Sequence, residues 1–206
     1  MSLSGRFFAA TYDRMSARFE KAGGAEMRSR LLAKASARVL EIGAGTGSNL
    51  AHYPEGVEEL VVTEPENPML RRLERKVGAV RPATRVVQTE GESLPFGDGS
   101  FDTVVSTLVL CTVRDPQATL AELRRVLKPG GQLLFLEHVR SDDPKLVRWQ
   151  DRLNPIWHGV AAGCNCNRPT LETIEAAGFT VEEVERDELP KAPRLVRPCV
   201  LGVATR

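Results

Sequence analysis

The sequence predicts an α/β fold built on one doubly wound, mostly parallel sheet. Short aliphatic runs alternate with helical segments from residue 37 onward, and a glycine-rich turn directly follows the first run. A third helical segment ends in Lys128-Pro129-Gly130-Gly131, which combines a basic last turn with proline and glycine in a strong helix stop. The 206 residues suit a single domain, residues 1–206, that buries a substantial core.

Apolar runs bounded by turn residues predict seven strands, over residues 38–42, 59–63, 84–89, 101–107, 132–139, 179–185 and 199–204. Helices are predicted over residues 46–52, 67–80, 116–127 and 170–177. Right-handed connections between parallel strands place ligands at the carboxyl ends of the strands, near the point where the strand order reverses.

Two segments lie outside this alternation. Residues 1–35 are predicted to form a helical N-terminal cap over the pocket. The large apolar side chains of this cap include Phe7, Phe8, Tyr12, Met15 and Phe19. Residues 140–169 show weak periodicity and hold both tryptophans, Trp149 and Trp157. We expect them to form a substrate lid, with a core beneath a long loop as the alternative.

The glycine-rich turn begins where the first predicted strand ends, and reads Glu41-Ile42-Gly43-Ala44-Gly45-Thr46-Gly47. Glycines at alternate positions let the backbone turn sharply and approach a ligand closely. Backbone N–H groups at the predicted helix start would point into the same pocket. The turn therefore predicts a site for a nucleotide-type cofactor, with an ordinary strand–helix connection as the alternative.

The spacing of the glycines and one carboxylate indicate which cofactor binds. A dinucleotide fingerprint requires G-x-G-x-x-G, but the sixth position from Gly43 is Ser48. Glu41 would repel a pyrophosphate because both groups are anionic. S-adenosylmethionine fits better, since it carries a sulfonium, an amino group and a ribose but no phosphate. The residues expected to bind it here are Glu41, Gly43, Ala44, Gly45, Thr46 and Gly47, together with Tyr12 of the cap.

An acidic residue ends the second predicted strand. Glu64, followed by Pro65, can accept hydrogen bonds from both ribose hydroxyls, or it can cap the next helix. Met69 lies one turn into that helix and suits either the adenine ring or the core.

A second acidic segment follows the third predicted strand. Glu90 can accept the adenine amino group, with Gly91 and Glu92 beside it, and a plain acidic loop is the alternative. The end of the fourth strand, at Thr107 and Leu108, is expected to lie under the sulfonium.

Four motifs follow one another in the first two thirds of the chain: Glu41-x-Gly43-x-Gly45-x-Gly47, Glu64, Leu94-Pro95-Phe96-x-x-x-Ser100-Phe101-Asp102 and Leu127-Lys128-Pro129-Gly130-Gly131. This set resembles that of the class I S-adenosylmethionine-dependent methyltransferases, in particular the methyltransferase type 11 group. The resemblance implies a Rossmann-like, seven-stranded sheet with an antiparallel last strand. It also implies that the cofactor leaves as S-adenosylhomocysteine, and it carries cofactor roles onto Glu41, Gly43, Gly45, Gly47, Glu64, Glu90 and Gly91.

The C-terminal half contains a further set of motifs: Phe135-Leu136-Glu137-His138-Val139, Trp149-Gln150, Pro155-x-Trp157, Gly163-Cys164, and Arg168-x-Thr170 through Phe179. These motifs resemble those of the methyltransferase-like subfamily that includes thiol S-methyltransferases. A small-molecule acceptor is therefore expected, in particular a thiol. The alternatives are a phospholipid amine N-methyltransferase, a quinone-type C- or O-methyltransferase, a nicotinamide-dependent oxidoreductase and a non-catalytic cofactor-binding module.

His138, at the end of the fifth predicted strand, is the candidate general base or substrate-orienting group. Methyl transfer is an in-line displacement for which the protein mainly positions the nucleophile. A thiol with a pKa near 8.5 is partly ionised at pH 7, so a modest base suffices. The alternative is a histidine hydrogen-bonded inside the lid. His158 is the second candidate, and His52 is expected on a helix surface.

The composition argues against several other classes. A net charge of +1 with no run of like charges disfavours nucleic-acid binding. No stretch approaches the ~20 apolar residues of a membrane span, and residues 1–10 lack the apolar core of a signal peptide. We therefore expect a cytoplasmic protein without a transmembrane segment. Peripheral membrane contact and the oligomeric state are left open.

The four cysteines are Cys111, Cys164, Cys166 and Cys199, and no two form a C-x-x-C pair. Cys164-Asn165-Cys166 with His158 nearby is too small a set for a four-ligand zinc site. Reduced thiols and no bound metal are therefore expected.

Overall fold

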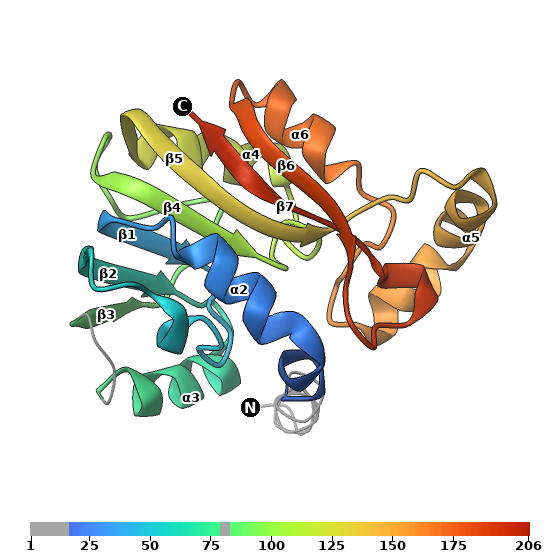
Figure 1. Ribbon diagram of the computed structural model, residues 1–206, viewed down its shortest axis with the longest axis horizontal. Helices are drawn as coiled ribbons and strands as arrows, with labels where there is room; N and C mark the ends of the chain where they lie inside the picture. Colours follow the sequence, from blue (N-terminus) through green and yellow to red (C-terminus); the bar gives the residue numbers. More distant parts are fainter. Residues whose placement is uncertain (1–16, 79–82) are drawn as a thin grey trace.

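The computed structural model describes residues 17–78 and 83–206. A seven-stranded sheet of order β3-β2-β1-β4-β5-β7-β6 runs through the molecule (Figure 1). Its strands are β1 (Ala37–Ile42), β2 (Val57–Thr63), β3 (Thr84–Val87), β4 (Phe101–Thr107), β5 (Leu127–His138), β6 (Thr180–Glu188) and β7 (Pro198–Thr205). Strands β1 to β5 pair in parallel, and β7 is antiparallel to both neighbours, β5 and β6. The predicted Rossmann-like α/β sheet with an antiparallel last strand is confirmed.

Helices cover both faces of this sheet. They are α2 (Ala25–Leu32), α3 (Asn67–Val77), α4 (Pro116–Val126), α5 (Pro144–Val160) and α6 (Thr170–Ala176). One apolar cluster joins the sheet to α2 and α3, and a second joins it to α4 and α6. Figure 1 shows α2 in front of the sheet, α4 and α6 behind it, and α5 projecting beyond the ends of β5 and β7.

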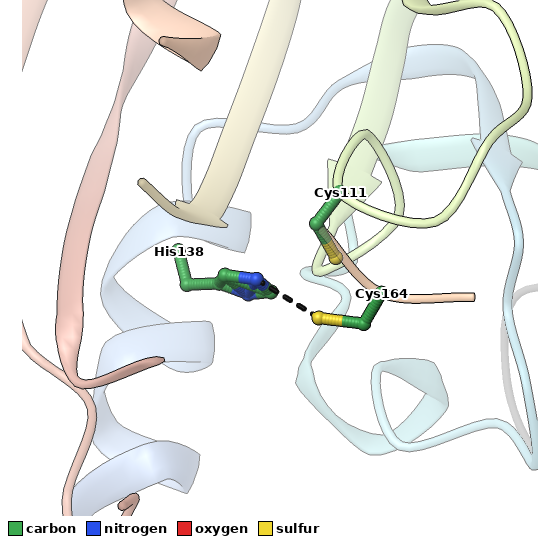
Figure 2. Close-up of side chains that lie close together, drawn as sticks. All are labelled: Cys111, His138 and Cys164. Carbon is green, nitrogen blue, oxygen red and sulfur yellow. Dashed lines mark hydrogen bonds between the residues drawn. The ribbon is translucent and has the colours of Figure 1, made fainter. Parts of the chain in front are cut away.

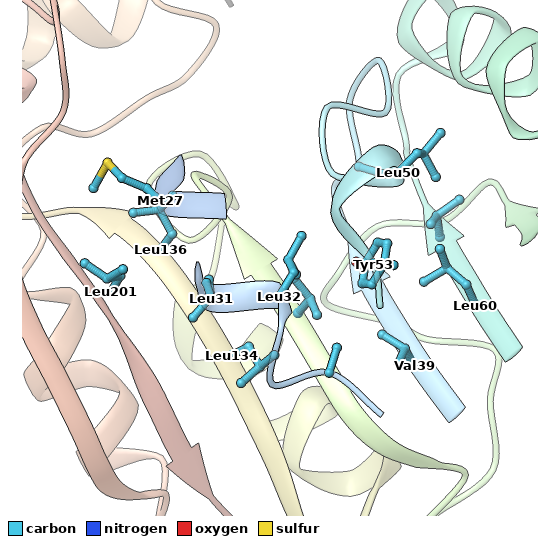
Figure 3. Packing of buried hydrophobic residues seen from close by; sticks show 14 of the residues in the cluster. Met27, Leu31, Leu32, Val39, Leu50, Tyr53, Leu60, Leu134, Leu136 and Leu201 are labelled. Carbon is cyan, nitrogen blue, oxygen red and sulfur yellow. The ribbon is translucent and has the colours of Figure 1, made fainter. Parts of the chain in front are cut away.

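The central strands supply both clusters because successive side chains of a strand point to opposite faces. In β5, Leu134 and Leu136 pack under α2, where Figure 3 shows them close to Met27 and Leu31. Leu133 and Phe135 belong to the opposite cluster. Burial on both faces explains why these strands read as continuous apolar runs.

The helix predicted over residues 46–52 is wrong. The glycine turn continues to Asn49 and is followed only by a short 3₁₀ helix, Leu50–His52. Gly45 and Gly47 have φ values of 58° and 82°, which an α-helix does not accept. The N–H of Gly47 instead donates to the Ala44 carbonyl at 2.9 Å and closes a turn.

The segment predicted as a lid contains the 17-residue helix α5. Its start has recognisable signals, because Asp143 accepts the Lys145 N–H and Pro144 occupies the first turn. α5 buries only one side chain completely, the polar Gln150, and it leaves the apolar side chains of Trp149, Ile156 and Val160 exposed.

Several boundaries differ by a few residues. β5 begins at Leu127, which pairs with Phe101, whereas the sequence predicts its start at residue 132. α3 ends at Val77, whereas the predicted helix extends to residue 80. Residues 79–82 lie outside the described residues.

The described part of the predicted N-terminal cap is helical, with a π-helical turn, Glu20–Gly24, before α2. The positions Phe7, Phe8, Tyr12 and Met15 lie outside the described residues. Among residues 17–78 and 83–206, no helix combines the length and the hydropathy needed to cross a membrane.

Candidate active site

A cavity of about 640 Å³ lies at the carboxyl ends of the parallel strands. This is where ligands bind in open α/β sheets, and the volume suits a small-molecule ligand. It is lined by these predicted site residues: Gly43, Gly45, Glu64, Pro65, Met69, Glu90, Gly91, Glu92, Leu108 and His138.

Other predicted cofactor residues lie behind this lining. They are Glu41, Ala44, Thr46, Gly47 and Thr107, all of which are buried or half-buried. Tyr12 lies outside the described residues. In the part of the chain that the structure describes, no residue from 17 to 35 lines the cavity.

The glycine turn is held in left-handed backbone conformations, with φ at Gly43 of 56°. A Cβ atom at Gly43 would lie 2.7 Å from a methyl carbon of Val109, which follows β4. The N–H of Gly45 donates to Glu64 Oε2 at 2.8 Å, so the turn is tied to the end of β2. Glycine at position 43 is therefore required by the neighbouring strand as well as by its own φ.

Glu41 lies under the turn in a buried polar network that the sequence did not reveal. Asn49 Nδ2 donates to Glu41 Oε1 at 2.9 Å, and the Tyr53 hydroxyl donates to Oε2 at 2.7 Å. Arg28 of α2 extends the network by donating to Asn49 Oδ1 and to Thr107 Oγ1. Burial raises the pKa of Glu41 above its usual value, although these hydrogen bonds and Arg28 oppose the shift.

Glu64 directly follows β2 and lines the cavity, and its carboxylate is held by the backbone. Besides the bond from Gly45, its Oε1 accepts the Glu66 N–H at 2.9 Å. Burial raises the pKa of Glu64, and the two backbone hydrogen bonds oppose that shift. A carboxylate oxygen has more than one acceptor direction, so Glu64 can accept further hydrogen bonds from a ligand.

The acidic loop after β3 contacts the start of α4. Glu90 pairs with Arg114 at 2.9 Å, and Glu92 Oε1 accepts the Arg114 N–H at 2.8 Å. The Arg114 and Glu90 side chains are 83% and 52% exposed, so this ion pair is open to rearrangement by a ligand.

The loop after β4 has a strained backbone beside the cavity. Leu108 has a φ of 60°, which is costly for a residue with a branched side chain. The next two N–H groups, of Val109 and Leu110, donate to Glu137 Oε1, as does the Ser106 hydroxyl at 2.7 Å. Burial raises the pKa of Glu137 to about 7 against these hydrogen bonds. Glu137 thus fixes the loop that presents Leu108 to the cavity.

His138 lines the cavity together with the thiols of Cys111 and Cys164. Figure 2 shows the three side chains close together. The Nε2 atom of His138 is 3.1 Å from Cys164 Sγ, and Cys111 Sγ lies close to both. Burial lowers the pKa of His138 to about 4, so the imidazole is neutral at pH 7. A pKa this low makes His138 a weak general base at neutral pH. Its geometry fits orientation or ligation better than proton removal.

Cys164 is the more acidic of the two thiols. Hydrogen bonds from Cys111 and from Trp157 Nε1, the latter at 3.1 Å, lower its pKa. The Cys111 pKa is raised well above its usual value by its hydrogen bond to Cys164 and by burial. The sequence suggested only ordinary reduced thiols here. The position of Cys111 shortly after β4, at the ligand-binding edge, is the signal that would have identified it.

The segment after β5 contributes one wall of the cavity. Trp157, Val160, Ala161 and Cys164 line it, whereas Trp149 is 55% exposed and does not. His158 is exposed on α5, and the His52 ring is hydrogen-bonded to Ser29 at 2.8 Å. His138 is therefore the one of the three histidines that the structure brings to the cavity.

A family model described as a methyltransferase domain matches residues 40–135. Human thiol S-methyltransferase TMT1A is 36% identical over 172 residues, which cover 82% of this chain and 70% of that protein. The chain belongs to the class I S-adenosylmethionine-dependent methyltransferases. A solved S-adenosylmethionine-dependent methyltransferase from Thermotoga maritima has the same fold as this methyltransferase, with a TM-score of 0.71 at 23% identity over 97% of each chain.

A second relative of the methyltransferase is named for a different acceptor. Phosphatidylethanolamine N-methyltransferase of Cereibacter sphaeroides is 31% identical over 148 residues, covering 67% of this chain and 71% of that protein. The comparisons therefore establish an S-adenosylmethionine-dependent enzyme that acts on a small molecule.

Proposed function

We propose that this methyltransferase transfers the methyl group of S-adenosylmethionine to the sulfur of a small thiol. The similarity to thiol S-methyltransferase TMT1A carries this proposal. A match over 82% of the chain leaves fewer than 40 residues outside it, so it includes residues 40–165 wherever it begins. The similarity therefore extends over the glycine turn and the wall that holds Cys111, His138 and Cys164.

The methyl donor would bind along the edge formed by β1, β2 and β3. The Glu64 carboxylate would accept the ribose hydroxyls while the backbone N–H groups of Gly45 and Glu66 hold it in place. Adenine would lie between Met69 and Gly91, both of which line the cavity. The methionine part would then lie over the glycine turn, and Glu41 would act on its positive charge from below the turn.

The acceptor would bind at the opposite wall, between Trp157 and His138. A thiol is partly ionised at neutral pH, and its thiolate is a strong nucleophile that needs positioning more than deprotonation. The neutral imidazole of His138 suits this positioning. We expect His138→Ala to lower the methyl-transfer rate while leaving S-adenosylmethionine affinity nearly unchanged.

The test is transfer from S-adenosylmethionine labelled in its methyl group to a panel of alkyl and aryl thiols, amines and quinols. Methylation of thiols alone would support the proposal, whereas methylation of amines or quinols in preference would overturn the acceptor assignment. Cofactor binding is followed by calorimetry with S-adenosylmethionine and with a nicotinamide dinucleotide. Binding of the latter in place of the former would overturn the donor assignment.

A phospholipid amine is the second candidate acceptor, and one surface feature favours it. Trp149, Ile156 and Val160 of α5 are 55%, 66% and 71% exposed, and Val160 also lines the cavity. Apolar side chains of this kind at a cavity mouth suit contact with a lipid surface. Vesicles containing phosphatidylethanolamine therefore belong in the same panel.

A reducing compartment such as the cytoplasm suits this activity. All four cysteines are unpaired and buried, and oxidation would remove the thiols from the proposed acceptor wall.

A further inference from the structure

Three side chains from distant parts of the sequence converge at the acceptor wall of the cavity (Figure 2). Cys111 follows β4, His138 ends β5, and Cys164 follows α5. Their Sγ, Nε2 and Sγ atoms all lie within 4.8 Å of one another, and all three side chains are buried. All three residues also line the cavity, so their shared centre is accessible to a ligand bound there.

Two thiolates and an imidazole are ligands that zinc prefers. Zn–S and Zn–N bonds of about 2.3 and 2.0 Å place tetrahedral ligand atoms about 3.5 Å apart for S and N and about 3.8 Å apart for two S atoms. His138 Nε2 and Cys164 Sγ are 3.1 Å apart, so an ion needs only small side-chain rotations to enter between them. The two thiolates would also balance the charge of a divalent ion.

Backbone and side-chain contacts other than those of the sulfur atoms hold the two cysteine loops together, although Cys111 Sγ also contacts the Leu108 carbonyl at 3.5 Å. The N–H of Asn165 donates to the Cys111 carbonyl at 2.8 Å, and its side-chain Nδ2 donates to the same oxygen at 3.2 Å. Arg168 donates to the Leu110 carbonyl beside Cys111. The ligand atoms are therefore brought together by the backbone, and Trp157 Nε1 at 3.1 Å from Cys164 Sγ orients one of them.

We propose that Cys111 Sγ, His138 Nε2 and Cys164 Sγ bind one Zn²⁺ ion whose fourth position opens into the cavity and binds the sulfur of the acceptor thiol. Sites with three protein ligands and one open position are those at which zinc activates a ligand. The part of this proposal that concerns the acceptor rests on the proposed function, but metal binding itself does not.

The step balances without an oxidant or reductant. The two cysteine thiols release their protons to solvent when the ion binds, and the acceptor thiol releases its own when it takes the fourth position. A lone pair of the bound sulfur forms the new S–C bond as the bond from the sulfonium to its methyl group breaks. The products are a thioether and S-adenosylhomocysteine, and the neutral thioether is a weak ligand that dissociates.

The neighbouring cysteine supplies a matched control. Cys166 is two residues from Cys164, but its Sγ contacts the Gln150 carbonyl and Asn154 Oδ1. It is absent from the cavity lining. Cys166→Ser therefore removes one thiol from the same loop and leaves the three proposed ligands in place.

Metal binding is tested with the full chain, stripped of metal and kept reduced with a phosphine, by titration with Co²⁺ alone. We expect one equivalent to produce the intense visible absorption of tetrahedral cobalt–thiolate coordination, and Zn²⁺ to displace it. Cys111→Ser, Cys164→Ser and His138→Ala should each weaken binding at least tenfold, since even the outer partners of metal ligands are worth about 10- to 100-fold. Cys166→Ser should bind as the wild type does.

Two results would overturn the site: no tetrahedral spectrum in the wild type, or a spectrum unchanged by all three ligand substitutions. S-adenosylmethionine affinity and circular dichroism are measured for each variant, so that loss of folding is separated from loss of a ligand. Should a single variant fail to fold, the other two still test the site.

The acceptor role has a separate readout. Adding a thiol that the enzyme methylates should shift the cobalt spectrum, and removing the metal should lower the methylation rate at least tenfold while S-adenosylmethionine still binds. An unshifted spectrum, or an unchanged rate without metal, would overturn the role of the ion while methyl transfer stands. A tetrahedral cobalt spectrum in a protein that methylates no thiol would instead overturn the proposed function and leave the metal site.

Discussion

The hydroxyl of Tyr53 donates a 2.7 Å hydrogen bond to Glu41 beneath the glycine turn, and both side chains are buried. Tyr53→Phe removes this donor, so a buried oxygen of the Glu41 carboxylate loses its hydrogen bond from Tyr53. We expect a loss of about 1–3 kcal/mol in the free energy of unfolding, measured with urea. The double variant with Glu41→Gln should lose less than the sum of the two single changes. Strict additivity would contradict the contact.

Glu41 itself should make stability depend on pH. Its pKa in the folded protein is raised by burial, so the protonated form is favoured there. Its contribution to stability is fully present below the ordinary value of 4.5 and is lost as pH rises through the folded pKa. Glu41→Gln cannot titrate, so the variant should gain stability relative to the wild type as pH rises above 4.5. Urea unfolding of both proteins at a series of pH values measures the difference, and a constant difference would contradict the assignment.

Glu64→Ala should weaken S-adenosylmethionine binding about 10- to 100-fold, because hydrogen bonds to a charged group are worth about 1.5–3 kcal/mol each. Calorimetry measures the affinity. Glu74→Ala, which removes an exposed carboxylate from α3 outside the cavity, should bind normally. Unchanged affinity in Glu64→Ala would remove this residue from the cofactor site.

Gly43→Ala should cost about 2–4 kcal/mol of stability, because the new methyl group meets Val109 and the left-handed φ disfavours a side chain. Adding Val109→Ala should recover part of that loss by removing the steric contact. Gly56→Ala is the control, since a Cβ there meets nothing within 4 Å. Thermal unfolding of the single and double variants measures the coupling between positions 43 and 109. Additive effects would mean that the Val109 side chain moves aside without cost.

Gln150 ties α5 to three loops, since its Nε2 lies within hydrogen-bonding distance of the carbonyl oxygens of Val139, Cys166 and Leu195. Gln150→Leu leaves these buried acceptors without a donor, and we expect a loss of at least about 2 kcal/mol. Hydrogen exchange should accelerate in α5 and in the following loop before the sheet opens. Arg148→Gln, at an exposed position of the same helix, should leave exchange unchanged.

The central strands of the sheet were predictable because they are buried on both faces and contain aliphatic runs. The position of Glu64 and His138 at the cavity followed from the rule that ligands bind at the carboxyl ends of parallel strands. His138 is the last residue of β5 and Glu64 directly follows β2, so strand boundaries alone placed them.

The buried networks were not predictable from the sequence. Arg28 and Thr107 lie 79 positions apart, and their contact depends on how α2 packs across the sheet. The same holds for Cys111 and Cys164, which lie 53 positions apart and meet where the chain turns back after α5. Local periodicity does not encode contacts between residues so far apart in the sequence. It also does not show that Gly45 and Gly47 adopt positive φ values, which prevent a helix directly after β1.

The place of β7 between β5 and β6 sets an order of assembly. Among the described residues β6 pairs with β7 alone, and the ribosome synthesises β7 after β6. Until β7 is synthesised, β6 is an unpaired strand. Its side chains are mostly charged and exposed: Thr180-Val181-Glu182-Glu183-Val184-Glu185-Arg186-Asp187-Glu188. Like charges on neighbouring copies of such a strand repel one another. The acidic edge thus protects the nascent chain from pairing with a second one before β7 is synthesised.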